Sequence, residues 1–128
     1  MSERKFTLEV VPGAYAVCQL DFDAEVPGWV SGAGTSGTRT PAELSIICSE
    51  ECVPGDVRSE SGWRCLRVVG PLEFSMVGVI ASLTGVLADA GLSVFVVSTF
   101  DTDCLLVKQA HLETAVKSLT SAGHSVSL

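Results

Sequence analysis

The most constraining feature of the sequence is an amphipathic helix pattern that follows a Gly-Pro turn. Its apolar residues recur at i, i+3, i+4 and i+7, the spacing of a helix with one buried face; they are Met76, Val79, Ile80, Leu83, Val86, Leu87 and Ala90. Ser75 is a good N-cap residue, and Gly91 stands where a helix-terminating glycine belongs. We therefore expect a helix that begins near Ser75 and ends at Gly91.

Apolar runs on both sides of this helix predict strands. Residues 63–69 alternate, with Trp63, Cys65, Arg67 and Val69 on one face and Leu66 and Val68 on the other. Residues 92–98 and 104–108 are apolar runs joined by a polar turn, and the first of them has so few polar positions that both of its faces are expected to be covered.

A second helix pattern over residues 110–122 and a final short strand over 124–128 complete this half of the chain. The resulting order is strand, helix, strand, strand, helix, strand, which is the ferredoxin-like βαββαβ order. The expected fold class is therefore α+β, with two helices on one face of a four-stranded antiparallel sheet.

The first half of the chain has a weaker pattern. Three runs are expected to be strands, namely residues 6–11, 14–20 and 43–48. Pro12-Gly13 predicts a turn between the first two, and one short helical turn is expected near Trp29. The Gly-, Ser- and Thr-rich residues 31–40 predict a loop that could include an irregular edge strand. Polar residues 50–62 are the predicted linker between two halves.

Composition and charge exclude several classes of partner. Of the 128 residues 47% are hydrophobic and 18% are charged, which is enough apolar material for a folded core. The net charge of −7 comes with scattered Lys and Arg, so nucleic acid and anionic membrane surfaces are poor partners. The sequence has no apolar run of membrane-spanning length and no signal-peptide pattern, and a cytoplasmic location is expected.

The residue types that carry chemistry point away from an enzyme. The five cysteines include no Cys-x-x-Cys, and reduced, buried thiols are expected. Cys48 and Cys52 form the only close pair, while His111 and His124 lie near element ends and are expected to be solvated, so no metal site or cofactor is predicted. No acid–base pair or activated nucleophile stands out, and residues 31–40 lack a phosphate-binding lysine.

Residues 62–108 resemble an ACT domain, a small regulatory fold that senses amino acids. The residues that carry the resemblance are Gly70-Pro71-Leu72, Gly78-Val79-Ile80, Leu87-Ala88, Ala90-Gly91, Ser98-Thr99-Phe100, Asp103 and Leu106-Val107. The similarity is greatest to tandem-ACT bacterial proteins of unassigned function, and more distant to the ACT modules of eukaryotic arginine-sensor proteins.

The resemblance also reaches the first half, through Tyr15-Ala16-Val17-Cys18, Thr38-Arg39-Thr40 and Glu43-Leu44-Ser45-Ile46. It implies that residues 1–60 form a degenerate ACT-like unit and residues 61–128 a complete ACT domain. In the degenerate unit one short helical turn would stand where a full helix is expected.

The resemblance further implies a ligand site. ACT domains typically bind an amino acid where the loop after the first strand and the start of the first helix face a neighbouring ACT unit. The N–H groups of a helix start suit a carboxylate, and a nearby side-chain carboxylate suits an ammonium group. The expected ligand-binding residues are Glu73, Phe74, Ser75, Gly78, Val79, Thr99, Phe100 and Asp103.

Several residues in or near this expected site also have a structural interpretation. Gly78 would fit a tight helix–sheet contact as well as a close approach by ligand. Asp101 and Asp103 suit ordinary turn chemistry, and Asp103 is also the aspartate that the arginine-sensor resemblance implies contacts ligand. Glu73 could favour the helix dipole or hold a cationic group. Arg67 could be an interface arginine or a partner for a ligand carboxylate.

The sequence therefore predicts a regulatory module without catalytic activity that binds an amino acid or a similar small metabolite. A homodimer is expected, and the signal would pass to a separate output protein, because no output domain is recognised in this sequence. The alternative is a structural or protein-interaction module that has kept the fold and lost the ligand.

Overall fold

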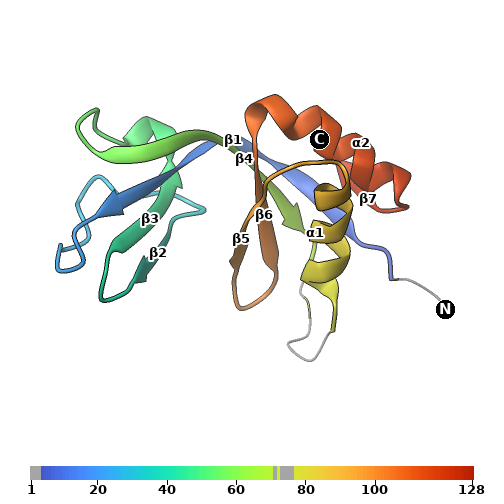
Figure 1. The fold of residues 1–128 in the computed structure, drawn as a ribbon, viewed down its shortest axis with the longest axis horizontal. Coiled ribbons are helices and arrows are strands. Elements are labelled where there is room, and N and C mark those ends of the chain that lie inside the picture. The colour runs from blue at the N-terminus through green and yellow to red at the C-terminus, as the bar shows by residue number, and fades with distance from the viewer. Residues whose placement is uncertain (1–3, 71, 73–76) are drawn as a thin grey trace. The chain divides into compact units, whose positions relative to one another are not determined.

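A computed structural model of the chain describes residues 4–70, 72 and 77–128 (Figure 1). The described residues form two compact units. The larger unit comprises Met1–Pro12 and Arg64–Leu128, and the smaller unit comprises Gly13–Trp63. No helix among the described residues is long and apolar enough to span a bilayer.

Two long strands each contribute to both units. The elements in chain order are β1 (Thr7–Leu20), β2 (Ser36–Arg39), β3 (Leu44–Ser49), η1 (Glu50–Cys52), β4 (Arg58–Val68), α1 (Val79–Asp89), β5 (Phe95–Ser98), β6 (Asp103–Lys108), η2 (Gln109–His111), α2 (Leu112–Ser121) and β7 (Ser125–Ser127). Strand β1 passes from the larger to the smaller unit at Gly13, which has φ +91°, and β4 returns close to Gly62, which has φ +80°. Each long strand thus has a glycine in the left-handed region near the place where it changes unit.

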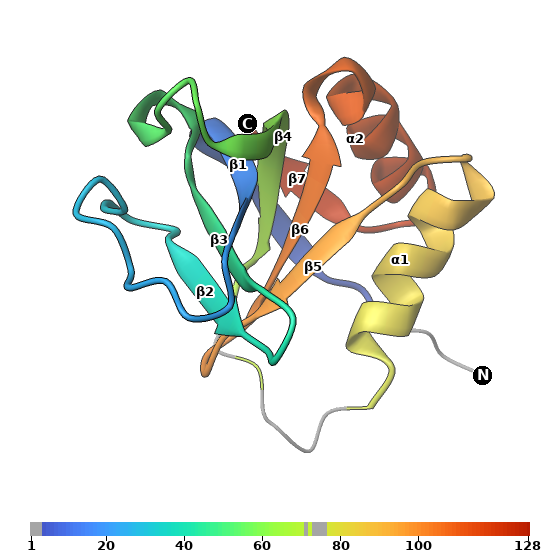
Figure 2. The ribbon, with the colours of Figure 1, turned by 60° about the vertical axis from the view of Figure 1, so that its left-hand side comes forward.

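The larger unit has the predicted ferredoxin-like order, β4-α1-β5-β6-α2-β7. Both helices lie on one side of its strands (Figure 2). The buried core between them combines β1, β4, β6 and both helices; it consists of Phe6, Leu8, Leu66, Val68, Val79, Leu83, Leu87, Leu105, Val107, Ala115 and Leu119. The predicted α+β fold, with two helices packed on one face of a sheet, is confirmed.

The sheet of this unit differs from the prediction in one strand. The first part of β1 lies next to β4 and pairs in parallel with β7, with Thr7 opposite Ser125, Leu8 opposite Val126 and Glu9 opposite Ser127. The predicted four-stranded antiparallel sheet is therefore wrong, because a segment far away in sequence adds a central strand. Leu8 is fully buried, and the burial of its apolar side chain stabilises this segment as a strand of the sheet.

The predicted turn at Pro12-Gly13 is also wrong, because β1 continues through both residues as one strand. A proline restricts the preceding residue to extended conformations, and its own φ suits a strand where no amide donor is needed. The predicted linker over residues 50–62 is also wrong, because this segment has secondary structure and hydrogen bonds of its own. It holds η1 and the start of β4, and the Glu50 carboxylate accepts a hydrogen bond from the Gly62 N–H at 2.9 Å.

Strand β5 lies at the end of the strand order, as a neighbour of β6 only. Its four residues are half-buried or exposed, and Phe95 keeps 37% of its surface accessible. The expectation that both faces of this strand are covered is therefore wrong for the single chain. An edge strand has neighbours on one side only, so an apolar sequence does not ensure burial.

The smaller unit is built on β3, which pairs antiparallel with β2 and with the second part of β1. Its core contains Ala16, Cys18, Leu44, Ile46 and Cys48. The predicted loop over residues 31–40 contains β2, so the expected edge strand is present. Gly34 lies against the ring of Tyr15, because a Cβ at Gly34 would come within 2.8 Å of the tyrosine Cε2 atom. This part of the Gly-rich segment therefore has a defined packing partner.

Candidate functional site

The entry to α1 is set by Gly78. The helix begins at Val79, with Gly78 as its N-cap residue at φ +81° and ψ +9°. The predicted start near Ser75 is too early. A Cβ at Gly78 would meet no described atom within 4 Å, so a tight helix–sheet contact does not explain the glycine. The left-handed backbone conformation of Gly78 explains the glycine, because L-residues with a Cβ adopt left-handed conformations only at an energetic cost.

The turn between β5 and β6 is closed by hydrogen bonds across its four residues. The Thr99 N–H and Thr99 Oγ1 donate to the Thr102 carbonyl oxygen, at 2.8 and 3.0 Å, and the Thr102 N–H donates to Thr99 Oγ1 at 3.3 Å. Ser98 and Asp103 are the last strand pair before the turn. This network fixes the backbone of the residues that carry Phe100 and Asp101.

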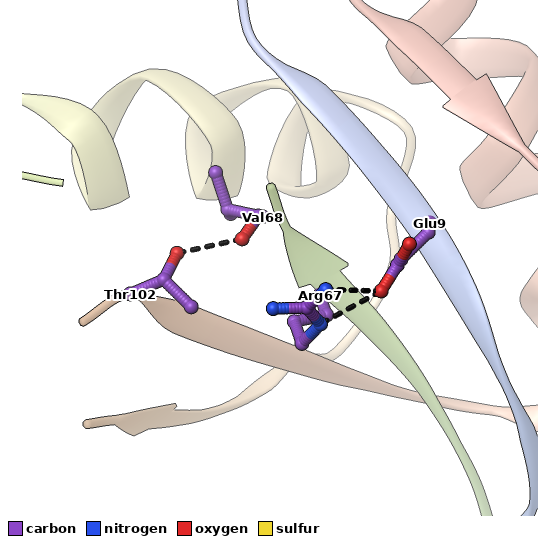
Figure 3. Close-up of polar contacts among 4 residues, drawn as sticks. All are labelled: Glu9, Arg67, Val68 and Thr102. Atoms are coloured by element: carbon purple, nitrogen blue, oxygen red, sulfur yellow. Dashed lines mark hydrogen bonds and ion pairs between the residues drawn. The ribbon is translucent and has the colours of Figure 1, made fainter. Parts of the chain in front are cut away.

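The turn is attached to the segment that leads from β4 towards α1. Buried Thr102 donates through Oγ1 to the Val68 carbonyl oxygen at 2.7 Å (Figure 3), and the Leu72 N–H donates to the Asp101 carbonyl oxygen at 2.6 Å. A Cβ on Gly70 would lie 3.1 Å from that same Asp101 oxygen. Gly70 therefore permits a close approach of two backbones, which brings the helix entry and the turn together.

A pocket of about 430 Å³ lies between the start of α1 and this turn. It is lined by Leu72, Gly78, Val79, Ile80, Ala81, Ser98, Thr99, Phe100, Asp101, Thr102 and Asp103. Five of the residues expected to bind ligand are among them, namely Gly78, Val79, Thr99, Phe100 and Asp103. The other three, Glu73, Phe74 and Ser75, lie outside the described residues. Sequence reasoning did not select Thr102, whose hydroxyl positions the turn.

The pocket combines negative side chains with a helix start. Asp101 and Asp103 supply two carboxylates, and no lining residue that the structure describes is a cation. Neither carboxylate has a hydrogen bond or ion pair with a described residue. The first N–H groups of an α-helix have no partner within the helix, and α1 has no side-chain N-cap hydrogen bond among the described residues. The pocket can therefore receive a cationic group at one end and an anionic group at the other.

Two other polar residues have internal roles. Arg67 is paired with the Glu9 carboxylate, with Arg67 Nε 2.8 Å from Glu9 Oε1 (Figure 3). It is not among the residues that line the pocket. His124 keeps only 4% of its surface accessible, and its Nδ1 accepts a hydrogen bond from the Phe6 N–H at 3.0 Å. The expectation that His124 is solvated is therefore wrong.

A comparison with protein-family models matches residues 58–121 to an ACT-domain model. A second model, which describes an N-terminal domain, matches residues 13–56. The ACT match spans half of the chain and contains the pocket. The chain therefore belongs to the ACT-domain family.

Several solved structures have a similar fold. A protein from Agobacterium tumefaciens has 39% identity and a TM-score of 0.91, over 97% of this chain and 93% of that one. A protein of unknown function from Vibrio cholerae has 20% identity and a TM-score of 0.76, over 91% and 89% of the two chains. The ligand-free regulatory subunit of aspartate kinase from Thermus thermophilus has 12% identity and a TM-score of 0.60, over 91% and 96%. No curated protein sequence matches the chain.

Proposed function

We propose that this protein is a regulatory module that binds an amino acid, without catalytic activity, in the pocket between the α1 start and the β5–β6 turn. The observation that carries the proposal is that one pocket pairs two carboxylates with a helix start, and that among the described residues neither the carboxylates nor the helix start has a side-chain partner. A zwitterion presents opposite charges to those two ends. The structural likeness to a regulatory subunit of aspartate kinase agrees with this class of function.

Within the proposed site Asp103 has the central role. The Asp103 side chain is half-buried, whereas that of Asp101 is exposed. Asp103 is also the first residue of β6, and its backbone is held by strand pairing with Ser98. A partly desolvated carboxylate interacts more strongly with an ammonium group than an exposed one does. The Val79 N–H and its neighbours at the helix start would bind the ligand carboxylate, with Gly78, Thr99 and Phe100 as walls. Glu73, Phe74 and Ser75 remain proposed members of the site.

The remaining parts of the proposal concern assembly. We propose a cytoplasmic homodimer whose two copies place ACT units side by side and pass the signal to a separate output protein. A ligand can shift the arrangement of the units only by its differential affinity for the two states. We propose that the smaller unit, Gly13–Trp63, is the degenerate ACT-like unit predicted over residues 1–60. The larger unit would then be the complete ACT domain predicted over residues 61–128, with the first part of β1 added to it.

A thermal-shift series with the common amino acids tests the function. Ligand at 100 times its Kd stabilises the folded state by about 2.7 kcal/mol, which raises the melting temperature by several degrees. Asp103→Asn should abolish the shift and leave the melting temperature without ligand close to wild type. Asp89→Asn, at the other end of α1, is the matched control and should keep the shift. A shift retained in Asp103→Asn would remove Asp103 from the site.

A second function is favoured by two exposed apolar side chains, Phe100 in the pocket lining and Val77 directly before Gly78 in the chain. Val77 keeps 95% of its surface accessible and Phe100 keeps 79%. Exposed apolar groups that cluster on a surface are typical of protein-interaction sites. If no amino acid at millimolar concentration changes the melting temperature, the interaction module becomes the preferred function. Sedimentation at several protein concentrations then tests whether the Val77 and Phe100 region joins two copies of the chain.

A further inference from the structure

Two cysteines meet on the sheet of the larger unit, on neighbouring strands. Leu66 and Val68 of β4 and Leu105 and Val107 of β6 belong to the core that the helices cover. Side chains alternate along a strand, so Cys65 and Cys104 are on the opposite face. β4 and β6 are neighbours in the strand order, and the two thiols are hydrogen-bonded to each other. Neighbouring strands lie about 4.8 Å apart, so two cysteines whose thiols meet across them are near enough for a disulfide.

The two thiols differ in access and in charge environment. Cys65 is buried, whereas Cys104 is half-buried, and both are free thiols. The hydrogen bond from Cys65, together with the positive charge of Arg67, lowers the pKa of Cys104 from 9.0 to about 7. The same hydrogen bond and burial raise the pKa of Cys65. One accessible, readily ionised thiol therefore stands in contact with one protonated thiol.

The smaller unit contains a second thiol pair that serves as an internal comparison. Cys18 and Cys48 are also hydrogen-bonded to each other, but both are buried in the apolar core of their unit. Burial raises the pKa of Cys18, and it raises that of Cys48 to about 11. No cationic group lowers either pKa. The charge of Arg67 and the accessibility of Cys104 thus distinguish the Cys65–Cys104 pair from a merely structural one.

We propose that Cys65 and Cys104 are a redox-active dithiol, which a hydroperoxide oxidises reversibly to an intrachain disulfide. The Cys104 thiolate attacks the terminal peroxide oxygen. An S–O bond forms, the O–O bond breaks, and the alkoxide or hydroxide that leaves takes up a proton. Cys104 is then a sulfenic acid.

The Cys65 sulfur next attacks the Cys104 sulfur. An S–S bond forms, the S–O bond breaks, and the hydroxide leaves as water with the proton of the Cys65 thiol. The two thiols lose two electrons in total and the hydroperoxide gains two. A small dithiol reductant restores both thiols by exchange through a mixed disulfide. Asp103, which lines the pocket, directly precedes Cys104, but the reaction itself does not depend on any pocket ligand.

The test uses the reduced 128-residue chain and hydrogen peroxide. Peptide mapping by mass spectrometry should show a Cys65–Cys104 disulfide before any other cysteine product, and dithiothreitol should remove it. Cys104→Ser should leave Cys65 reduced, and Cys65→Ser should hold Cys104 as a sulfenic acid that dimedone labels. Cys18→Ser is the matched control and should not slow disulfide formation.

Three results would overturn the proposal. The first is that another cysteine, such as half-buried Cys52, is oxidised faster than Cys104 in the wild-type protein. The second is that wild-type Cys104 proceeds to the sulfinic acid without a disulfide. The third is that the disulfides formed join two chains rather than Cys65 and Cys104. All three are read from the wild-type protein, so the outcome does not depend on whether a variant folds.

Discussion

The hydroxyl of Thr102 donates a hydrogen bond of 2.7 Å to the carbonyl oxygen of Val68, a residue 34 positions earlier in the chain (Figure 3). Thr102 is the last residue before β6, and Val68 is the last residue of β4. Because Thr102 is 6% accessible, water is largely kept from this bond. The contact therefore joins the two segments that form the pocket.

Thr102→Val should destabilise the protein by about 1–3 kcal/mol, because it leaves the Val68 carbonyl without its side-chain donor in a buried place. Thr102→Ser keeps the hydroxyl and is the control for the lost hydrogen bond. Urea unfolding of the three proteins measures the effect as a lower midpoint at an unchanged slope. Equal midpoints for the Val variant and the wild type would contradict the role assigned to this bond.

Alanine substitutions at Gly78 and Gly85 should change the stability of the protein in opposite directions. Gly78→Ala places a Cβ at φ +81° and should cost about 1–2 kcal/mol. Gly85→Ala lies within the helix, in open space, and should stabilise the protein by about 0.5–1 kcal/mol. Thermal unfolding of both variants gives the comparison. A neutral or stabilising Gly78→Ala would show that the left-handed N-cap is not required.

A second pair of glycines isolates a steric contact in the smaller unit. Gly32 and Gly34 both have positive φ, +96° and +84°, so alanine at either position is strained. Only at Gly34 does the new Cβ also meet the Tyr15 ring, at 2.8 Å. Gly34→Ala should therefore cost about 1–3 kcal/mol more than Gly32→Ala. Chemical unfolding measures the difference, and equal losses would mean that Tyr15 moves aside freely.

The alkylation of Cys104 should report its ionisation. The pKa of about 7 implies that roughly half of this thiol is ionised at neutral pH, against a few per cent for an ordinary cysteine. Its rate with iodoacetamide, resolved by peptide mapping, should rise with pH through a midpoint near 7. Arg67→Gln removes the cation and should move the midpoint upward. A wild-type midpoint near 9.0, the ordinary value, would contradict the assigned environment.

Local periodicity was sufficient to predict that both helices exist and where α1 ends, although α1 begins later than expected, at Val79. The stripe that includes Leu83 and Leu87 is buried as expected, and Gly91 ends the helix with φ +79°. The Leu92 N–H then donates to the Leu87 carbonyl oxygen at 3.0 Å, which is the usual C-terminal closure. These features depend on residues within a few positions of one another, so a single sequence contains them.

The features that the sequence did not predict depend on distant partners. Buried His124 has its hydrogen-bond partner 118 positions away at Phe6, and the chain around each residue shows nothing of the other. Thr102 is polar and lies in a turn, which by itself predicts exposure. The candidate site likewise combines features that the local sequence shows with features that depend on distant residues. The glycines and aspartates near it were visible in the sequence, whereas the bonds that hold its two sides together were not.

The path of β1 and β4 has an evolutionary consequence. Along the chain the smaller unit is an insertion within the larger one, because Met1–Pro12 and Arg64–Leu128 fold together. The Val69 N–H donates to the Thr7 carbonyl oxygen, and Arg67 is paired with Glu9, so this part of β1 and the end of β4 run in opposite directions. A hairpin turn in place of residues 13–63 would preserve both strand ends. An ancestor could therefore have acquired or lost the smaller unit in a single event at the tip of one hairpin, without any other break in the chain.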